Sequence, residues 1–137
     1  MRDILFRGKR VDNGEWIYGH YGEYFNEERN VPCISVIDAH ALTGSLCYDV
    51  VLQSVGEYTG LTDKNGKKIF ENDIIEYDET KNTYYQIVWI NSGWGHKELD
   101  TGICELFPTN YGHNPTCFNN VKIISNIFDN PELLEVE

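Results

Sequence analysis

Hydrophobic positions along the chain alternate over short stretches that are separated by Gly- and Asn-containing turns. The clearest alternation is at 83–90, where Tyr85, Ile87 and Trp89 would share one face of a strand and apolar residues also occupy the other face. The same pattern predicts further strands at 4–6, 16–18, 31–37, 54–59, 69–70, 73–77, 102–107 and 121–128. Helical periodicity is almost absent, which predicts a mainly β sandwich or small barrel.

The segments between the strands carry turn and loop signals. Two Asn-Gly pairs, at 13–14 and 65–66, predict hairpin turns because both turn positions favour positive φ. Pro32 places its strand at a sheet edge or at a strand start, since proline has no N–H for the ladder. Asn130 followed by Pro131 predicts one short C-terminal helical turn at most. Loops, turns or connections are predicted at 23–30, 38–44, 91–95 and 111–119.

Composition and charge narrow the class of protein. The 137 residues are 41% hydrophobic, enough for one folded domain with a core, and no segment has the length of a membrane span. The net charge of −11 disfavours broad binding to nucleic-acid phosphates and favours basic partners. The N-terminal segment has no signal-peptide pattern, so a cytoplasmic protein without membrane association is expected.

The cysteines indicate a reducing environment. Cys33, Cys47, Cys104 and Cys117 include no C-x-x-C pair. Without a secretory signal, we expect reduced and mostly buried thiols rather than disulfides.

Three blocks of sequence resemble the YopX family of phage and prophage proteins. The central block is Val55-Gly56-Glu57-Tyr58-Thr59-Gly60-Leu61-Thr62-Asp63-Lys64-Asn65-Gly66-Lys67-Lys68-Ile69-Phe70-Glu71-Asn72-Asp73-Ile74-Ile75. Residues 2–7 resemble the opening of the family and residues 124–134 its close. Asn72 departs from the pattern, because it stands where the family usually has Gly. Asn tolerates the left-handed backbone conformation, so the turn is expected to survive.

The resemblance implies an architecture and no reaction. It implies a mainly β protein with a small SH3-like barrel and additional N-terminal strands, encoded by a phage or prophage in a bacterial cell, that tends to self-associate. Residues 1–137 would form a single YopX-like domain. A possible subdivision is an N-terminal β layer at 1–50 and a barrel at 51–137.

The residues of the central block favour a structural role. Gly60 and Gly66 suit positive φ, and Asp63 can close an Asx-type turn over residues 65 and 66. Core residues are expected at Ile69, Phe70, Ile74 and Ile75. The alternative is that the block forms a binding surface.

Three clusters of residues are candidates for chemistry. The carboxylates Glu71, Asp73, Glu76, Asp78 and Glu79 could hold a divalent cation or a basic partner, with Glu71 and Asp73 on one strand face. The simpler interpretation is that these carboxylates form a solvated strand edge, whose charges prevent pairing with the edge of another sheet. A calcium loop at 63–74 is rejected, because its Gly and Glu positions do not match.

The other two clusters are a thiol and imidazole set and a basic group. The first, which could form a zinc site with non-standard spacing, is His96, Cys104, His113 and Cys117; Cys104 or Cys117 with His113 is also a candidate nucleophile pair. The basic group could bind single-stranded nucleic acid or an acidic neighbouring subunit, and it consists of Arg2, Arg7, Lys9 and Arg10 with Trp16, Tyr18 and Tyr21. Further cations are found at Lys64, Lys67 and Lys68. For the thiol and imidazole set, ordinary thiols and loop imidazoles without a bound metal remain the favoured interpretation.

The sequence therefore predicts a non-enzymatic, oligomeric protein-binding module with a host or phage protein as candidate partner. Phosphate-cradling and nucleophile-elbow motifs are lacking, and we assign no catalytic, cofactor-binding or metal-binding residue and no cofactor. One alternative is a nucleic-acid-binding β-barrel acting in phage replication or regulation. Another is a metal-dependent enzyme that uses the acidic run 71–79.

Overall fold

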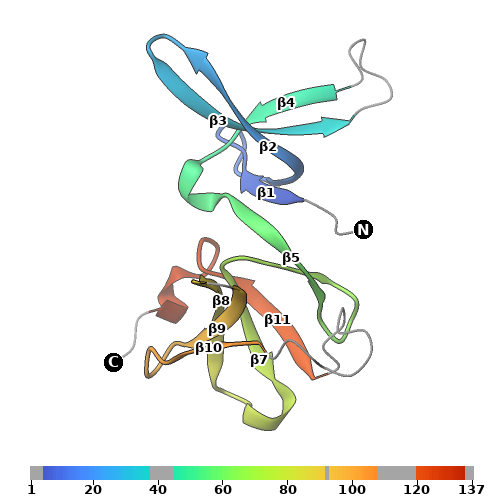
Figure 1. Cartoon of the computed structure of the whole chain (residues 1–137), viewed down its shortest axis with the longest axis vertical. Coiled ribbons are helices and arrows are strands. Elements are labelled where there is room, and N and C mark those ends of the chain that lie inside the picture. Colours follow the sequence, from blue (N-terminus) through green and yellow to red (C-terminus); the bar gives the residue numbers. More distant parts are fainter. Residues whose placement is uncertain (1–4, 38–44, 92, 108–119, 135–137) are drawn as a thin grey trace. The chain divides into compact units, whose positions relative to one another are not determined.

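The chain folds into two compact units, Met1–Tyr58 and Thr59–Glu137. The computed structural model describes residues 5–37, 45–91, 93–107 and 120–134. In both units antiparallel strands dominate and the described helical segments are single 3-10 turns, so the protein is mainly β as predicted (Figure 1).

The first unit is built on a meander of four antiparallel strands. These are β1 (Phe6–Lys9), β2 (Trp16–Asn26), β3 (Arg29–Ile37) and β4 (Ser45–Asp49), and their order in the sheet is β4-β3-β2-β1. A 3-10 turn, η1 (Leu52–Ser54), follows β4, and the first residues of β5 (Gly56–Thr62) pair with β1. An isolated bridge between Arg10 and Val50 also joins the end of β1 to the end of β4.

The first unit contains more strand than the sequence pattern predicts. Residues 23–30 are not a loop, because β2 and β3 continue through them to a two-residue turn at Glu27 and Glu28. Their side chains are exposed, so this part of the hairpin needs no apolar residues and carries no alternating pattern. Strand β4 was also not among the predicted strands, and the predicted connection 38–44 lies outside the described residues.

Pro32 lies in a strand with neighbours on both sides. Strand β3 lies between β2 and β4, so the predicted edge position is wrong. The carbonyl of Pro32 accepts a hydrogen bond from the N–H of Val50, one residue beyond the end of β4. Because the N and O atoms of a residue in an antiparallel strand point to the same side, the missing N–H faces the end of the β4 ladder. The sheet therefore loses little by having proline there.

The second unit contains the end of β5 and a five-stranded antiparallel sheet. β5 lies beside β6 (Lys68–Phe70). The sheet has the order β10 (Cys104–Leu106), β9 (Gly93–Glu98), β8 (Tyr84–Ile90), β7 (Asp73–Tyr77) and β11 (Val121–Asn126). The 3-10 turn η2 (Asp78–Thr80) follows β7, and η3 (Pro131–Leu134) follows β11.

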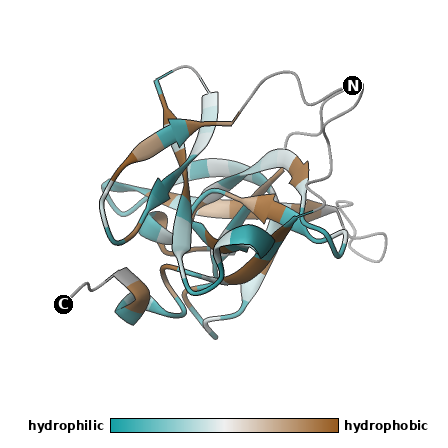
Figure 2. Cartoon of the chain, turned by 90° about the horizontal axis from the view of Figure 1, so that it is seen from below, coloured by the Kyte–Doolittle hydropathy of each residue, from teal (hydrophilic) through white to brown (hydrophobic). Residues whose placement is uncertain are grey.

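The core of the second unit comes from the family-like block and the strands around it. Ile69, Ile75, Ile87 and Val121 are fully buried in one cluster. Phe70 and Ile74 are buried as well, so all four predicted core residues of the block are confirmed. Figure 2 shows the hydrophobic stretches along the strands and hydrophilic residues in many of the connections, the distribution that drives burial.

Strand β9 was missed, because its glycines resemble a turn. The predicted turn at 91–95 covers only its start, and β9 runs on from Gly93 to Glu98. Gly95 is needed for pairing: a Cβ there would lie 2.3 Å from the carbonyl oxygen of Glu105 and 2.6 Å from Cδ1 of Ile90. The glycine thus permits a close approach of two strands rather than a reversal of the chain.

The two Asn-Gly turns are present but differ from the predicted geometry. Gly14 and Gly66 have φ of 72° and 80°, whereas neither preceding Asn is among the residues with positive φ. At 63–67, the N–H of Asp63 donates to the carbonyl of Lys67 around a three-residue loop. This arrangement fits a turn followed by a left-handed glycine better than a two-residue hairpin.

The finer fold predictions are met in part. The strand order of each sheet is open, so a closed SH3-like barrel is not confirmed. The C-terminal helical turn is confirmed as η3, but η1 and η2 are two further 3-10 turns that the sequence pattern did not reveal. Such turns need only one or two local hydrogen bonds and leave no periodicity to detect.

Candidate functional site

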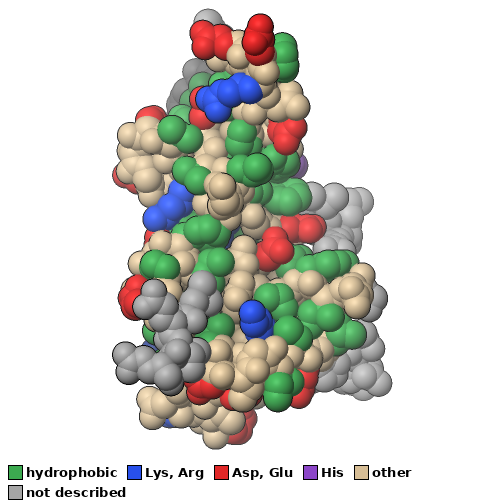
Figure 3. Space-filling view, turned by 90° about the vertical axis from the view of Figure 1, so that its left-hand side faces the viewer, with side chains coloured by type: hydrophobic (Ala, Val, Ile, Leu, Met, Phe, Trp, Pro, Cys, Tyr) green, Lys and Arg blue, Asp and Glu red, His purple; other side chains and the backbone are tan. Residues whose placement is uncertain are grey.

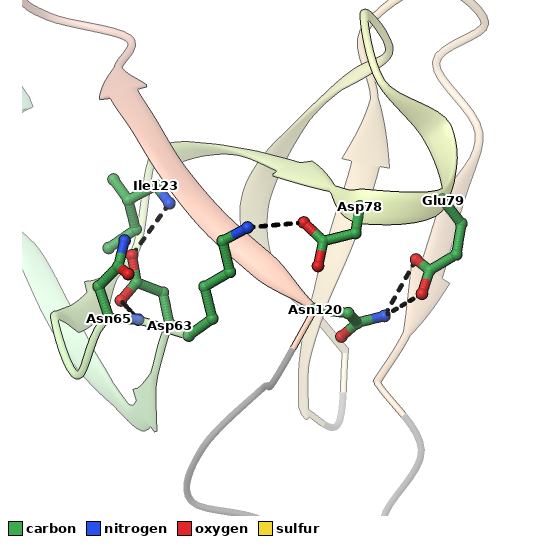
Figure 4. Close-up of polar contacts among 7 residues, drawn as sticks. Asp63, Asn65, Asp78, Glu79, Asn120 and Ile123 are labelled. Atoms are coloured by element: carbon green, nitrogen blue, oxygen red, sulfur yellow. Dashed lines mark hydrogen bonds and ion pairs between the residues drawn. The ribbon is translucent and has the colours of Figure 1, made fainter.

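Asp63 organises the family-like block from inside the second unit. Its carboxylate is buried, with 1% of the residue exposed. Oδ1 accepts the N–H of Asn65 at 2.9 Å and Oδ2 accepts the N–H of Ile123 at 3.1 Å (Figure 4). Oδ1 also accepts the N–H of Lys67 at 2.9 Å. The predicted Asx-type turn is confirmed. The positive φ of Gly60, at 88°, and of Gly66 agree with the structural interpretation of the block.

The acidic run 71–79 does not gather at one place. Asn72 has a left-handed φ of 72°, as predicted, which turns the chain before β7 begins at Asp73. Glu71 therefore lies outside the strand, and the predicted shared face with Asp73 is wrong. Asp73 is buried and accepts the N–H of Phe70 at 2.7 Å, so it closes the turn between β6 and β7.

The remaining carboxylates of the run have separate partners. Glu76 accepts the N–H of Asn82 at 2.8 Å. Asp78 pairs with the ammonium group of Lys64 at 2.8 Å, and Glu79 accepts the side-chain amide of Asn120 (Figure 4). Within the described part of the chain, no three His, Cys, Asp or Glu side chains are placed to hold a metal ion.

The candidate zinc residues that the structure describes lie on opposite faces of a sheet. His96 on β9 is directly opposite Glu105, whereas Cys104 is opposite Lys97. Because neighbouring residues of a strand point to opposite faces, His96 and Cys104 cannot bind the same ion. His113 and Cys117, and with them the candidate nucleophile pairs, lie outside the described residues.

His96 instead belongs to an aromatic cluster. Its ring packs against Tyr77, Tyr85 and Phe107, with centroid distances of 5.4, 4.6 and 5.6 Å. Nδ1 lies 2.5 Å from the hydroxyl of Tyr77, and Nε2 lies 3.9 Å from a carboxylate oxygen of Glu105. Burial lowers the pKa of His96, although Glu105 acts in the opposite direction. The His96 ring is therefore a packing residue of the sheet, and its neutral form is favoured.

The basic cluster of the first unit is engaged by aromatic rings of the same unit. The guanidinium of Arg7 lies 4.5 Å above the ring of Trp16, and Nζ of Lys9 lies 5.5 Å from it. The guanidinium of Arg10 lies 4.3 Å from the ring of Tyr48 and also pairs with a nearby carboxylate. Each of these cations lies over a ring on which a base could otherwise stack. Arg2 lies outside the described residues.

The prediction of mostly buried thiols is wrong for the described cysteines. Cys33 is buried, but Cys47 and Cys104 are exposed. Cys47 lies on the missed strand β4, so no burial pattern could be assigned to it from the sequence.

The end of the β2–β3 hairpin carries exposed aromatic residues that the sequence analysis missed. Phe25 is 71% exposed. Tyr24, on the other face of β2, is 40% exposed and donates its hydroxyl to Asp49 at 2.7 Å. The turn that follows consists of Glu27 and Glu28, with φ of 47° and 71°. We call Tyr24, Phe25, Glu27 and Glu28 the hairpin tip. Figure 3 shows acidic and hydrophobic side chains at this end of the first unit, at the top of the view, with a cationic side chain between them.

The fold resembles a solved structure. The crystal structure of protein EF1440 from Enterococcus faecalis aligns with a TM-score of 0.56 and 23% sequence identity, covering 98% of this chain and 100% of the other. The architecture is thus that of a two-unit, antiparallel β protein. Residues 5–135 match the sequence profile of the YopX protein family, and the chain belongs to that family.

The search of curated proteins gives no match. In the part of the chain that the structure describes, no helix combines the length and the apolar character needed to cross a membrane.

Proposed function

We propose that this YopX-family chain is a non-enzymatic, self-associating protein-binding module that is encoded by a phage or prophage and acts in the bacterial cytoplasm. The hairpin tip would contact the partner. The observation that carries the proposal is Phe25, a large aromatic side chain that is 71% exposed at the end of a hairpin. Exposed aromatic residues of this kind are the usual anchors of protein interfaces.

The turn beside Phe25 supports the same surface. Two-residue turns with positive φ at both positions favour Asn-Gly, yet this one holds Glu27 and Glu28. Each non-glycine residue in this conformation costs about 1 kcal/mol of stability. Because this conformation of Glu27 and Glu28 lowers the stability of the hairpin, their carboxylates indicate a role other than folding.

The chemistry of the partner follows from the charges. With a net charge of −11 and two carboxylates at the hairpin tip, the chain would attract a basic protein. That partner should offer an apolar pocket for the Phe25 ring, rimmed by Lys or Arg.

The expected SH3-like character of the second unit is also part of this proposal. It is supported by the five-stranded antiparallel sheet of that unit.

The test is a pull-down with the tagged chain from nuclease-treated lysate of the bacterium that carries the gene, read by quantitative mass spectrometry. Two variants are compared with the natural chain: Phe25→Ser, and Glu27→Asn combined with Glu28→Gly. The second should make the hairpin more stable by about 1 kcal/mol while removing the charges. A partner retained by the natural chain and lost with both variants supports the proposal.

Other outcomes would contradict it. Equal recovery of every partner with the variants would remove the hairpin tip as the contact surface. Recovery only of material that nuclease removes would favour the nucleic-acid alternative, with steep salt dependence as its signature. Stabilisation of the purified chain by magnesium or calcium would favour the metal-dependent alternative.

A further inference from the structure

Strands β3 and β4 bring Cys33 and Cys47 together at the end of the sheet in the first unit. The register places Cys33 opposite Asp49 and Cys47 opposite Ser35. Opposite residues share a face and successive residues alternate, so the two cysteines are diagonal neighbours on one face. The side chain of Cys47 is near enough to Cys33 to contribute to the raised pKa of the Cys33 thiol.

The two thiols differ in access to solvent. Cys33 is 5% exposed, whereas Cys47 is exposed. Burial, followed by the neighbouring Cys47 side chain, raises the pKa of Cys33 to about 12. At neutral pH Cys33 is therefore a thiol rather than a reactive thiolate, and Cys47 is the group that a reagent in solution can reach.

We propose that Cys33 and Cys47 form a thiol–disulfide exchange site that reacts with small-molecule disulfides of the glutathione class and closes to an intramolecular disulfide. The two thiols share one face of neighbouring strands, and their unequal exposure gives the two cysteines different roles. Cys47 is the attacking residue and Cys33 the resolving residue. The site adjoins the hairpin tip, because the hydroxyl of Tyr24 donates to Asp49, the residue opposite Cys33, but the inference does not depend on the proposed function.

The reaction balances in two steps. The thiolate of Cys47 attacks one sulfur of the small disulfide, forms a mixed disulfide and releases one small thiolate. Cys33 then loses its proton to water or buffer, and its thiolate attacks Sγ of Cys47 and releases the second small thiolate. The two released thiolates take up the two protons. The protein is oxidised by two electrons, and the small disulfide is reduced to two thiols.

The buried thiol sets the speed of closure. Because the second step needs the thiolate of Cys33, its rate should rise roughly tenfold for each pH unit between pH 7 and 9. The product would join β4, which lies at the end of the strand order, covalently to β3. Oxidation would therefore restrict the opening of that strand.

The experiment uses the full chain with oxidised glutathione under native conditions, followed by acid quenching, intact mass spectrometry and non-reducing peptide mapping. The expected main product is the Cys33–Cys47 disulfide, with Cys104 carrying glutathione as an unpaired exposed thiol. In Cys33→Ser, Cys47 should stop at the mixed disulfide. Cys104→Ser is the matched control and should close as the natural chain does.

Two results would overturn the proposal. The first is a natural chain that keeps glutathione on Cys47 at pH 9 while its circular dichroism stays native. The second is a distribution of disulfides that is the same under native conditions and in concentrated urea, because the fold would then contribute no selectivity. Loss of the Cys33–Cys47 preference in urea, by contrast, supports a site built by β3 and β4.

Discussion

The carboxylate of Asp63 accepts a hydrogen bond from the backbone N–H of Ile123, 60 residues farther along the chain. The same buried side chain also accepts the N–H groups of Asn65 and Lys67 in its own turn. One residue thus closes the turn of the family-like block and fastens it to the last strand of the second unit.

Removal of this carboxylate should destabilise the protein strongly. Asp63→Ala leaves three backbone donors without their acceptor, and we expect a loss of about 3 kcal/mol in the free energy of unfolding. Asp63→Asn keeps one acceptor oxygen and should cost roughly half as much. Urea unfolding measures both. Equal stability of the alanine variant and the natural chain would show that water or other groups replace the carboxylate.

Two glycines of β2 should differ sharply when changed to alanine. A Cβ at Gly19 would lie 2.2 Å from the carbonyl oxygen of Ser35, whereas a Cβ at Gly22 would meet nothing within 4 Å. Gly19→Ala must therefore push β2 and β3 apart, and we expect a loss of about 2 kcal/mol or more. Gly22→Ala, the control on the same strand, should be neutral or slightly stabilising. Similar thermal unfolding of both variants would contradict the close approach of the strands.

Acid should weaken the second unit through His96. Burial lowers the pKa of His96 below its ordinary value of 6.5, so the unfolded chain binds a proton more readily than the folded one. This contribution to stability is complete above pH 6.5, and it is lost as the pH falls through the lower, folded-state pKa. His96→Phe should make the unfolding temperature less sensitive to pH between 7 and 5.

The control for this prediction is His20→Gln, because the side chain of His20 is exposed. That variant should keep the pH dependence of the natural chain. An unchanged pH profile in His96→Phe would mean that carboxylates, rather than the His96 ring, determine the response to acid.

Self-association can be tested at Trp89. This side chain is 51% exposed on β8 and packs edge-on against Trp94 at a centroid distance of 5.0 Å. A large exposed indole favours contact with a second subunit. At micromolar concentration, light scattering should give a native mass above 15.8 kDa, and Trp89→Ser should lower it.

Phe25→Ser is the control for that measurement, because it changes the hairpin tip and leaves β8 intact. It should keep the native mass of the natural chain. A natural chain that is monomeric would contradict the predicted oligomer, whereas an oligomer unaffected by Trp89→Ser would move the contact elsewhere.

Local signals explain what could be predicted of the fold. The turn at Asp63, the left-handed Asn72 and the buried pair Ile74 and Ile75 all depend on residues a few positions apart. Such features are encoded in φ preferences, side-chain hydrogen bonds to the neighbouring backbone and short apolar runs.

Strands whose stability comes from their partners could not be predicted. Gly95 reads as a turn residue until Glu105 is seen to approach it, and residues 23–30 read as a loop until the pairing of β2 with β3 is known. In the same way, no spacing in the sequence indicates that Arg7 stacks on Trp16. Each of these depends on a cross-strand register that the alternation of apolar residues does not specify.

The sequence by itself thus determined the β class, the family, the acidic character and the turn at Asp63. Only the tertiary structure decided that the acidic run is divided among separate partners, that Phe25 is exposed at a hairpin end and that Cys33 and Cys47 are diagonal neighbours on two strands. The physical reason is the range of the interactions. Turns and strand propensity act within a few residues, whereas the neighbours of a side chain in a sheet are set by register between segments that may be far apart in sequence.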